Sequence, residues 1–170
     1  MIYAFDTYYD DNFAHTACIG FSDWEAELPE VELSEKIMGS QEYVSGEFFR
    51  RELPCILSLL KQLTLQEGDI IIVDGYVVLD DEGKHGLGGY LYESLSQKTA
   101  IVGVAKNNFA TLYALKRTVL RGESVKPLYV TALGIDVDEM ADKIQKMHGP
   151  YRIPTLLKKL DILSRNWPES

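Results

Sequence analysis

The pattern of apolar and polar positions in the first half of the chain predicts three strands and a helix. Residues 1–8 alternate as a strand does, and Phe13–Phe21 form a second apolar, β-prone run. From Trp24 to Leu33 apolar residues alternate with glutamates, which is typical of a half-exposed antiparallel edge strand, and Pro29 fits such an edge. After a polar loop, leucine and isoleucine recur at helical spacing from Leu53 to Leu63, so this segment is expected to form an amphipathic helix.

The second half alternates between short apolar runs and helical patterns. Ile70–Val73 and Ile101–Val104 are continuous apolar runs typical of buried strands, and Pro127–Ala132 is a further predicted strand. Helices are expected in three places: after the glycine-rich loop 83–89, after a capping residue at Asp136 or Asp138, and from Leu156 to Leu163. Residues 1–170 are therefore predicted to be a single α/β domain. Its mixed sheet would have three antiparallel strands first and parallel strands afterwards, flanked by helices.

Three acidic residues stand at positions where this architecture would bring side chains together. The order of elements resembles the ribonuclease H-like architecture, in which the first and fourth strands lie side by side and carry acids near one end; Asp6 and Asp74 are on those strands. Glu52 begins the predicted helix. Converging carboxylates are the ligands that Mg²⁺ and Mn²⁺ prefer, and such ions can activate water and stabilise the leaving oxygen of a phosphodiester. The alternative is structural: the two aspartates cap strand ends and the glutamate caps a helix.

The charge of the chain argues against broad, non-specific binding to nucleic acid. The formal net charge is −9. One region differs, because residues 98–126 contain six basic residues and a single acid. These bases are Lys98, Lys106, Lys116, Arg117, Arg121 and Lys126. They could form a local basic face, although a solvated surface segment explains the charges equally well.

Several classes of protein are disfavoured by what the sequence lacks. Cys18 and Cys55 lie among apolar residues, which favours buried free thiols over a disulfide. The three histidines show no metal-ligand spacing with the cysteines, so a structural zinc site is not expected. No apolar run approaches the roughly 20 residues of a membrane helix, and the first residues do not resemble a signal peptide. We therefore expect a cytoplasmic protein without a membrane partner.

Five motifs, in order along most of the chain, carry a resemblance to a known family. They are Asp6 with Tyr9 three residues later, the segment from Tyr43 through Gly46 to Glu52, the run Ile72–Gly75, the run Val102–Lys106 and, as the fifth, the two late stretches Pro127–Val130 and Gly149–Pro154. Together they are similar to the motifs of endonuclease V, a metal-dependent nuclease of DNA repair. Members of that family nick nucleic acid near deaminated adenine, as deoxyinosine or inosine.

The resemblance implies a role for each matched residue. Asp6, Glu52 and Asp74 would be metal ligands for Mg²⁺ or Mn²⁺ and catalytic residues. Lys106 would be catalytic, placing a positive charge near the scissile phosphate or the attacking water. Tyr43 would be a wedge that enters the duplex where the base leaves the stack.

Three glycines would bind substrate by letting the backbone approach the extruded base closely, since they lack a Cβ atom. They are Gly46, Gly75 and Gly103. From the residues alone, Lys106 could equally be a solvated lysine, Tyr43 a packing residue, and the glycines part of turns.

The chain departs from the family pattern at places that bear on function. The family's His-Pro-Arg after Val-Asp-Gly is replaced by a longer acidic stretch containing Asp80, Asp81 and Glu82. The family's late Gly-His corresponds to Ala132-Leu133, and leucine can neither ligate a metal nor move a proton. Val77 replaces a second glycine of the base site and would crowd that pocket.

Two other functions remain open from the sequence. One is a related nuclease with a changed substrate, favoured by the acidic loop and Val77. The other is a non-catalytic nucleic-acid-binding or metal-binding protein, favoured by Leu133 and the acidic balance.

Overall fold

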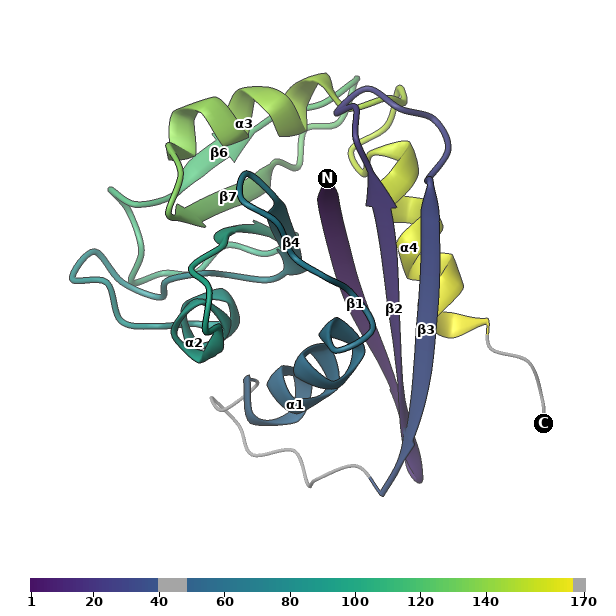
Figure 1. Cartoon of the computed structure of the whole chain (residues 1–170). Helices are drawn as coiled ribbons and strands as arrows, with labels where there is room; N and C mark the ends of the chain where they lie inside the picture. Colours follow the sequence, from purple (N-terminus) through teal and green to yellow (C-terminus); the bar gives the residue numbers. More distant parts are fainter. Residues whose placement is uncertain (40–48, 167–170) are drawn as a thin grey trace.

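The computed structural model describes residues 1–39 and 49–166, and in these ranges a mixed sheet of seven strands carries two helices on each face (Figure 1). The strands are β1 (Ile2–Asp10), β2 (Phe13–Phe21), β3 (Val31–Met38), β4 (Ile70–Asp74), β5 (Ala100–Ala105), β6 (Arg117–Val119) and β7 (Leu128–Leu133). The helices are α1 (Phe49–Leu60), α2 (Leu87–Ser94), α3 (Val137–Lys146) and α4 (Thr155–Arg165). The strand order across the sheet is β3-β2-β1-β4-β5-β7-β6.

The centre of the sheet consists of the parallel strands β1, β4 and β5. Phe5 of β1 is opposite Val73 of β4, and Val73 is opposite Gly103 of β5. The carboxyl ends of the three strands therefore meet at one edge of the sheet, which we call the carboxyl edge. Asp6 lies within β1 where its pairing with β4 ends, and Asp74 is the last residue of β4, so the two aspartates lie on neighbouring strands directly after this register.

Each face of the sheet is covered by one pair of helices. On one face, Ile72 and Val104 pack in a core with residues of α3 and α4, among them Ile144 and Leu160. On the other face, Val73 packs in a second core with residues of α1 and α2, among them Leu59 and Leu91. Because the central strands are buried on both faces, they read as continuous apolar runs rather than as alternating ones.

The edge strand lies later in the chain than the sequence pattern predicted. Trp24–Leu33 was expected to form it, but β3 spans Val31–Met38, where half-buried and exposed residues alternate. The backbone N–H of Glu30 donates to the carbonyl of Gly20 and so starts the pairing with β2. Pro29 lies before that point. The alternation of glutamates around Pro29 is therefore a property of the connecting loop.

The end of the sheet also differs from the prediction, because β7 is antiparallel to β5. A parallel partner would need a crossover connection, usually a helix, between the two strands. Here two loops and the short strand β6, which the sequence pattern missed, join them at the carboxyl edge. Because β7 begins at this same edge, it runs back along the sheet, antiparallel to β5. No helix in the described ranges is long and apolar enough to cross a membrane.

Candidate active site

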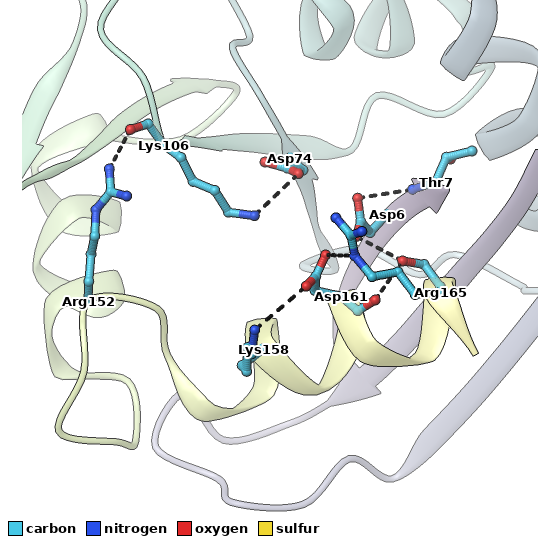
Figure 2. A network of polar contacts seen from close by, with 9 residues as sticks. Asp6, Thr7, Asp74, Lys106, Arg152, Lys158, Asp161 and Arg165 are labelled. Atoms are coloured by element: carbon cyan, nitrogen blue, oxygen red, sulfur yellow. Dashed lines mark hydrogen bonds and ion pairs between the residues drawn. The ribbon is translucent and has the colours of Figure 1, made fainter. Parts of the chain in front are cut away.

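Asp6 and Asp74 face the same side of the sheet, towards α4 (Figure 2). One carboxylate oxygen of Asp6 accepts the backbone N–H of Thr7 at 3.0 Å. Its other oxygen accepts the hydroxyl of Ser164, from α4, at 3.1 Å. Asp74 lies 3.9 Å from the ammonium nitrogen of Lys106. The two predicted strand-end aspartates and the predicted lysine are thus together, as the parallel register requires.

Glu52 reaches the same place from the other side of the sheet. It lies in the first turn of α1, is buried, and lines the same cleft as Asp6 and Asp74. The guanidinium of the neighbouring Arg51 stacks over the ring of Tyr9, 3.7 Å from its centroid. A carboxylate in the first turn of a helix also benefits from the positive end of the helix dipole. The third predicted acid is therefore brought into the cleft by α1.

Asp161, on α4, is a fourth carboxylate of this cleft, and the sequence reasoning missed it. Its oxygens lie 3.1 Å from the guanidinium of Arg165 and 3.9 Å from the ammonium of Lys158 (Figure 2). A signal was present in the sequence. Asp161 follows Leu157 by four residues and precedes Ser164 by three, so a charged residue lies on the face that α4 turns to the sheet.

The cleft has a volume of about 360 Å³ and is open to solvent at the carboxyl edge. The four acids line it together with Lys106 and Arg165, and aromatic residues and backbone of β1 and residues 74–76 complete its walls. Within residues 1–39 and 49–166, no three His, Cys, Asp or Glu side chains stand in a metal-holding cluster. The acids are instead engaged with Lys106, Ser164 and Arg165. An all-oxygen, carboxylate-rich donor set nevertheless fits a hard divalent cation.

The ionisation of the cleft acids reflects their crowding. Burial, and then the charge of Asp74, raise the pKa of Asp6 to about 7. Burial, followed by the charges of Asp74 and Asp6, raises the pKa of Glu52 well above its usual value. Burial also raises the pKa of Asp74, although Lys106 opposes the shift. The carboxylates of the cleft lack sufficient positive charge, which protons or a metal ion would supply.

Leu133, which was expected to leave a gap in the site, lies far from it. It pairs with Ile101 at the amino end of β5, whereas Lys106 follows the carboxyl end of the same strand. Leu133 packs against the core on the side of α1 and α2. The concern that this leucine removes a histidine from the centre is therefore wrong for this fold, and the additional polar group in the cleft is Asp161.

The predicted substrate-binding residues fall into two groups. Tyr43 and Gly46 lie outside the described residues. Gly75 lines the cleft with a φ of +136°, a conformation that favours glycine, and a Cβ added there would meet no atom within 4 Å. At Gly103, by contrast, a Cβ would lie 2.5 Å from the carbonyl oxygen of Gly75 and 2.7 Å from the hydroxyl of Thr131. Gly103 thus allows close packing within the protein, and Val77 beside it is fully buried.

The aspartates of the acidic loop accept hydrogen bonds from within the protein. The carboxylate of Asp81 accepts backbone N–H groups from Tyr113, Ala114 and Leu115, at 2.9, 2.8 and 3.3 Å. The carboxylate of Asp80 accepts the N–H groups of Glu82 and Lys84 in its own loop. The two aspartates hold loops together.

Most of the basic residues in 98–126 do not form a shared basic face. Arg121 is buried and donates to backbone carbonyls, including that of Met147 at 2.5 Å. Arg117 is paired with Asp138 at 2.5 Å, and Lys98 with Glu93 at 3.6 Å. Most of these cations are therefore used within the fold.

Comparison with known proteins identifies a family for this chain. The family model for endonuclease V matches residues 1–129. Human endonuclease V superposes with a TM-score of 0.73 at 23% identity, over 96% of this chain and 82% of the human chain. A Ciona intestinalis endonuclease V variant, solved with a 23-mer DNA containing an inosine followed by a ribo-adenosine, gives 0.78 at 19% identity, over 96% and 83%.

The Bacillus subtilis endonuclease V gives a TM-score of 0.71 at 18% identity, over 96% of this chain and 78% of the bacterial one. A sequence search of curated proteins finds no match. The predicted family resemblance and the ribonuclease H-like mixed sheet are both confirmed.

Proposed function

Because the chain belongs to the endonuclease V family, we propose that it is a metal-dependent endonuclease that hydrolyses a phosphodiester near a deaminated base in DNA or RNA. The observation that carries the proposal is the position of Asp6 and Asp74 directly after the paired residues Phe5 and Val73 of adjacent parallel strands, with Glu52 and Asp161 in the same cleft. The Ciona intestinalis relative was solved with inosine-containing DNA, which supports a nucleic-acid partner of that kind.

Asp6, Asp74, Glu52 and Asp161 are the residues that would hold Mg²⁺ or Mn²⁺. The bound ion would supply an activated water and stabilise the leaving oxygen of the phosphodiester. Lys106, half-exposed beside Asp74, would contact a non-bridging phosphate oxygen and stabilise the charge that develops there. Ser164 would orient the Asp6 carboxylate through its hydroxyl. With four acids around the cleft, the phosphate backbone would be repelled unless a cation is bound, so substrate binding and metal binding should depend on each other.

The proposed roles of the glycines and of Tyr43 concern the base rather than the phosphate. Gly75, open towards the cleft, would let a base approach the backbone. Gly103 would shape that site from behind by allowing the carbonyl of Gly75 to pack closely. Tyr43 would act as the wedge and Gly46 would bind the base beside it, as in the family motif.

The test is cleavage of labelled oligonucleotides with one deoxyinosine or inosine, as single-stranded DNA, duplex DNA and RNA, over a series of Mg²⁺ and Mn²⁺ concentrations. We expect metal-dependent nicking, and we expect Asp74→Asn to reduce it by at least about 100-fold. A loss of this size exceeds the one typical of a residue that only orients a ligand, so it would identify Asp74 as a ligand itself. Asp142→Asn is the matched control, because Asp142 is also an exposed aspartate paired with a lysine. Absence of cleavage on every inosine substrate at saturating metal would overturn the proposal.

A second candidate is a nuclease of this type that does not select a deaminated base. Fully buried Val77 favours it, because its backbone N–H is bound to the hydroxyl of Thr131 at 2.9 Å and its side chain fills space beside Gly88. The same assay separates the two candidates. Equal cleavage of adenine-containing and inosine-containing strands would establish the second, and a clear preference for inosine the first.

A further inference from the structure

Next to the cleft lies an exposed aromatic surface to which the site described above assigns no role. Tyr113, in the loop between β5 and β6, is 72% exposed. The ammonium of Lys116 lies 5.7 Å from the centroid of the Tyr113 ring and 5.4 Å from that of Tyr129. Both distances are within the range of a cation–π interaction. We call Tyr113, Lys116 and Tyr129 the tyrosine–lysine surface.

This surface is continuous with the wall of the cleft. Tyr129 is paired with Ala105 across β7 and β5, and Ala105 lines the cleft directly before Lys106. Lys116 also donates a hydrogen bond to the side chain of Asn108, two residues beyond Lys106. Tyr129 is also near Tyr76, which lines the cleft, so a strand that leaves the cleft on this side would reach the tyrosine–lysine surface.

The loop that carries the surface is held in place. Asp81 accepts the N–H groups of Tyr113 and of the two residues that follow. The hydroxyl of Thr111 donates to the carbonyl of Leu79 at 2.7 Å, and Arg117 donates to that of Ala114 at 2.7 Å. An exposed tyrosine on an anchored loop loses little conformational entropy when a partner binds, so it is preorganised for contact.

The chemistry of the surface selects a kind of partner. In this region Arg117 and Arg121 are paired within the fold, whereas Lys116 contacts the neutral Asn108 and the aromatic rings, and the carboxylate of Asp81 is near enough to feel its charge. A cation beside exposed aromatic rings suits a polyanion that also offers flat apolar faces. Single-stranded nucleic acid has both, because its phosphates are charged and its bases are free to stack. In a duplex the bases are already stacked on one another.

We propose that the tyrosine–lysine surface binds the single-stranded part of a nucleic acid that continues out of the cleft, with a base stacked on Tyr113 and the adjoining phosphate on Lys116. This rests on the proposed function, since it takes the cleft to hold the phosphodiester. It adds the path of the strand and a preference for unpaired nucleic acid on that side of the cleft.

The test measures binding rather than cleavage. The full chain carrying Asp74→Asn, with Mg²⁺ present at saturating concentration, is titrated into labelled oligothymidylate and into a matched duplex, and fluorescence anisotropy is followed at several salt concentrations. We expect Tyr113→Ala to weaken single-strand binding by about 10-fold, because a stacked base contributes on the order of 1–3 kcal/mol. Tyr113→Phe, which keeps the ring, should bind within about twofold of the parent.

Lys116→Gln should weaken single-strand binding and lower the slope of log affinity against log salt by about 0.7, the loss of one phosphate contact. Lys98→Gln is the matched control. Lys98 also lies over a tyrosine ring, 4.7 Å from the centroid of Tyr92, but it precedes β5 at the end of that strand opposite Lys106. It should change neither affinity nor slope.

The proposal is overturned if the parent does not bind oligothymidylate, or if Tyr113→Ala and Lys116→Gln bind it like the parent. Cleavage assays on the wild-type chain decide the proposed function separately. Binding that depends on Tyr113 and Lys116, without cleavage of any substrate, would support strand binding by the tyrosine–lysine surface and overturn the proposed nuclease function. Cleavage without such dependence would reject the surface alone.

Discussion

Arg121 and the acids of the cleft form two centres of buried charge, and these are satisfied in opposite ways. Arg121, 4% exposed, donates to carbonyl oxygens of Met147 at 2.5 Å, Gly149 at 3.0 Å and Tyr151 at 2.5 Å. The N–H groups of its guanidinium are thus paired with backbone carbonyls of the loop between α3 and α4. In the cleft, Asp6 and Glu52 are largely buried, yet their nearest charged neighbours include like charges that raise their pKa values.

The difference separates a structural charge from a functional one. The carbonyls around Arg121 complete its hydrogen bonds, so the centre holds the loop and needs nothing from outside. The carboxylates repel one another and would be stabilised by a ligand of opposite charge. Replacing Arg121 should therefore lower the free energy of unfolding, whereas replacing an acid of the cleft should leave it unchanged or raise it. Cleavage activity should respond in the opposite way and fall when an acid of the cleft is replaced.

The largest effect on stability is expected for Arg121→Met. Methionine keeps much of the volume but leaves the carbonyls of residues 147, 149 and 151 without donors, so we expect a loss of about 3 kcal/mol or more in the free energy of unfolding. Arg117→Met is the control, because Arg117 forms a partly exposed pair with Asp138 and should cost less than about 1 kcal/mol. Urea denaturation measures both, and equal losses would contradict a special role for Arg121.

Asp161→Asn should act on function without harming the fold. We expect cleavage to fall by at least about 100-fold and the midpoint of metal activation to move to higher concentration, because one oxygen ligand loses its charge. The free energy of unfolding without metal should be unchanged or higher, since one like charge is removed. A variant with normal cleavage and normal metal dependence would remove Asp161 from the proposed centre.

The pH dependence of stability should come from the cleft rather than from Arg121. Since the pKa of Asp6 is raised to about 7 in the folded chain, the folded state binds this proton more tightly than the unfolded state. The contribution of Asp6 to stability is therefore present at low pH and is lost as the pH rises to about 7. Asp6→Asn should flatten this part of the profile, and added Mg²⁺ should restore stability above pH 7. Urea midpoints between pH 5 and 8 that are the same in both proteins would contradict the prediction.

Ser164→Ala should give the smallest effect. It removes the hydroxyl that donates a hydrogen bond to Asp6 at 3.1 Å and that also lies 2.8 Å from the carbonyl oxygen of Asp161, so its one proton is shared between two acceptors and the loss in the free energy of unfolding should be about 1 kcal/mol. Because that bond lowers the pKa of Asp6, its loss should raise this pKa further. Carboxyl NMR titration of Asp6 would show the shift, whereas an unchanged titration would mean that Ser164 only packs α4 against β1.

Much of the candidate site followed from local sequence pattern. Asp6 and Asp74 each follow an apolar run that forms a central strand, and parallel neighbours end at the same edge of a sheet. Glu52 could be placed because the amphipathic pattern that follows it marks the start of α1. In each case, strand or helix periodicity carried the information. Asp161 was missed because the apolar spacing of α4 gives a helix but does not show which element it covers.

The sequence by itself determined most of the strands and helices, the acids Asp6, Glu52 and Asp74 that accompany them, and the family to which the motifs are similar. Tertiary structure alone decided what those residues face. It turned β7 back along β5 and so carried Leu133 away from the cleft, buried Arg121 among carbonyls, and attached Asp81 to the backbone of residues 113–115. The physical reason is that periodicity reports local backbone geometry, whereas the partner of a charge is chosen by packing between segments far apart in the chain.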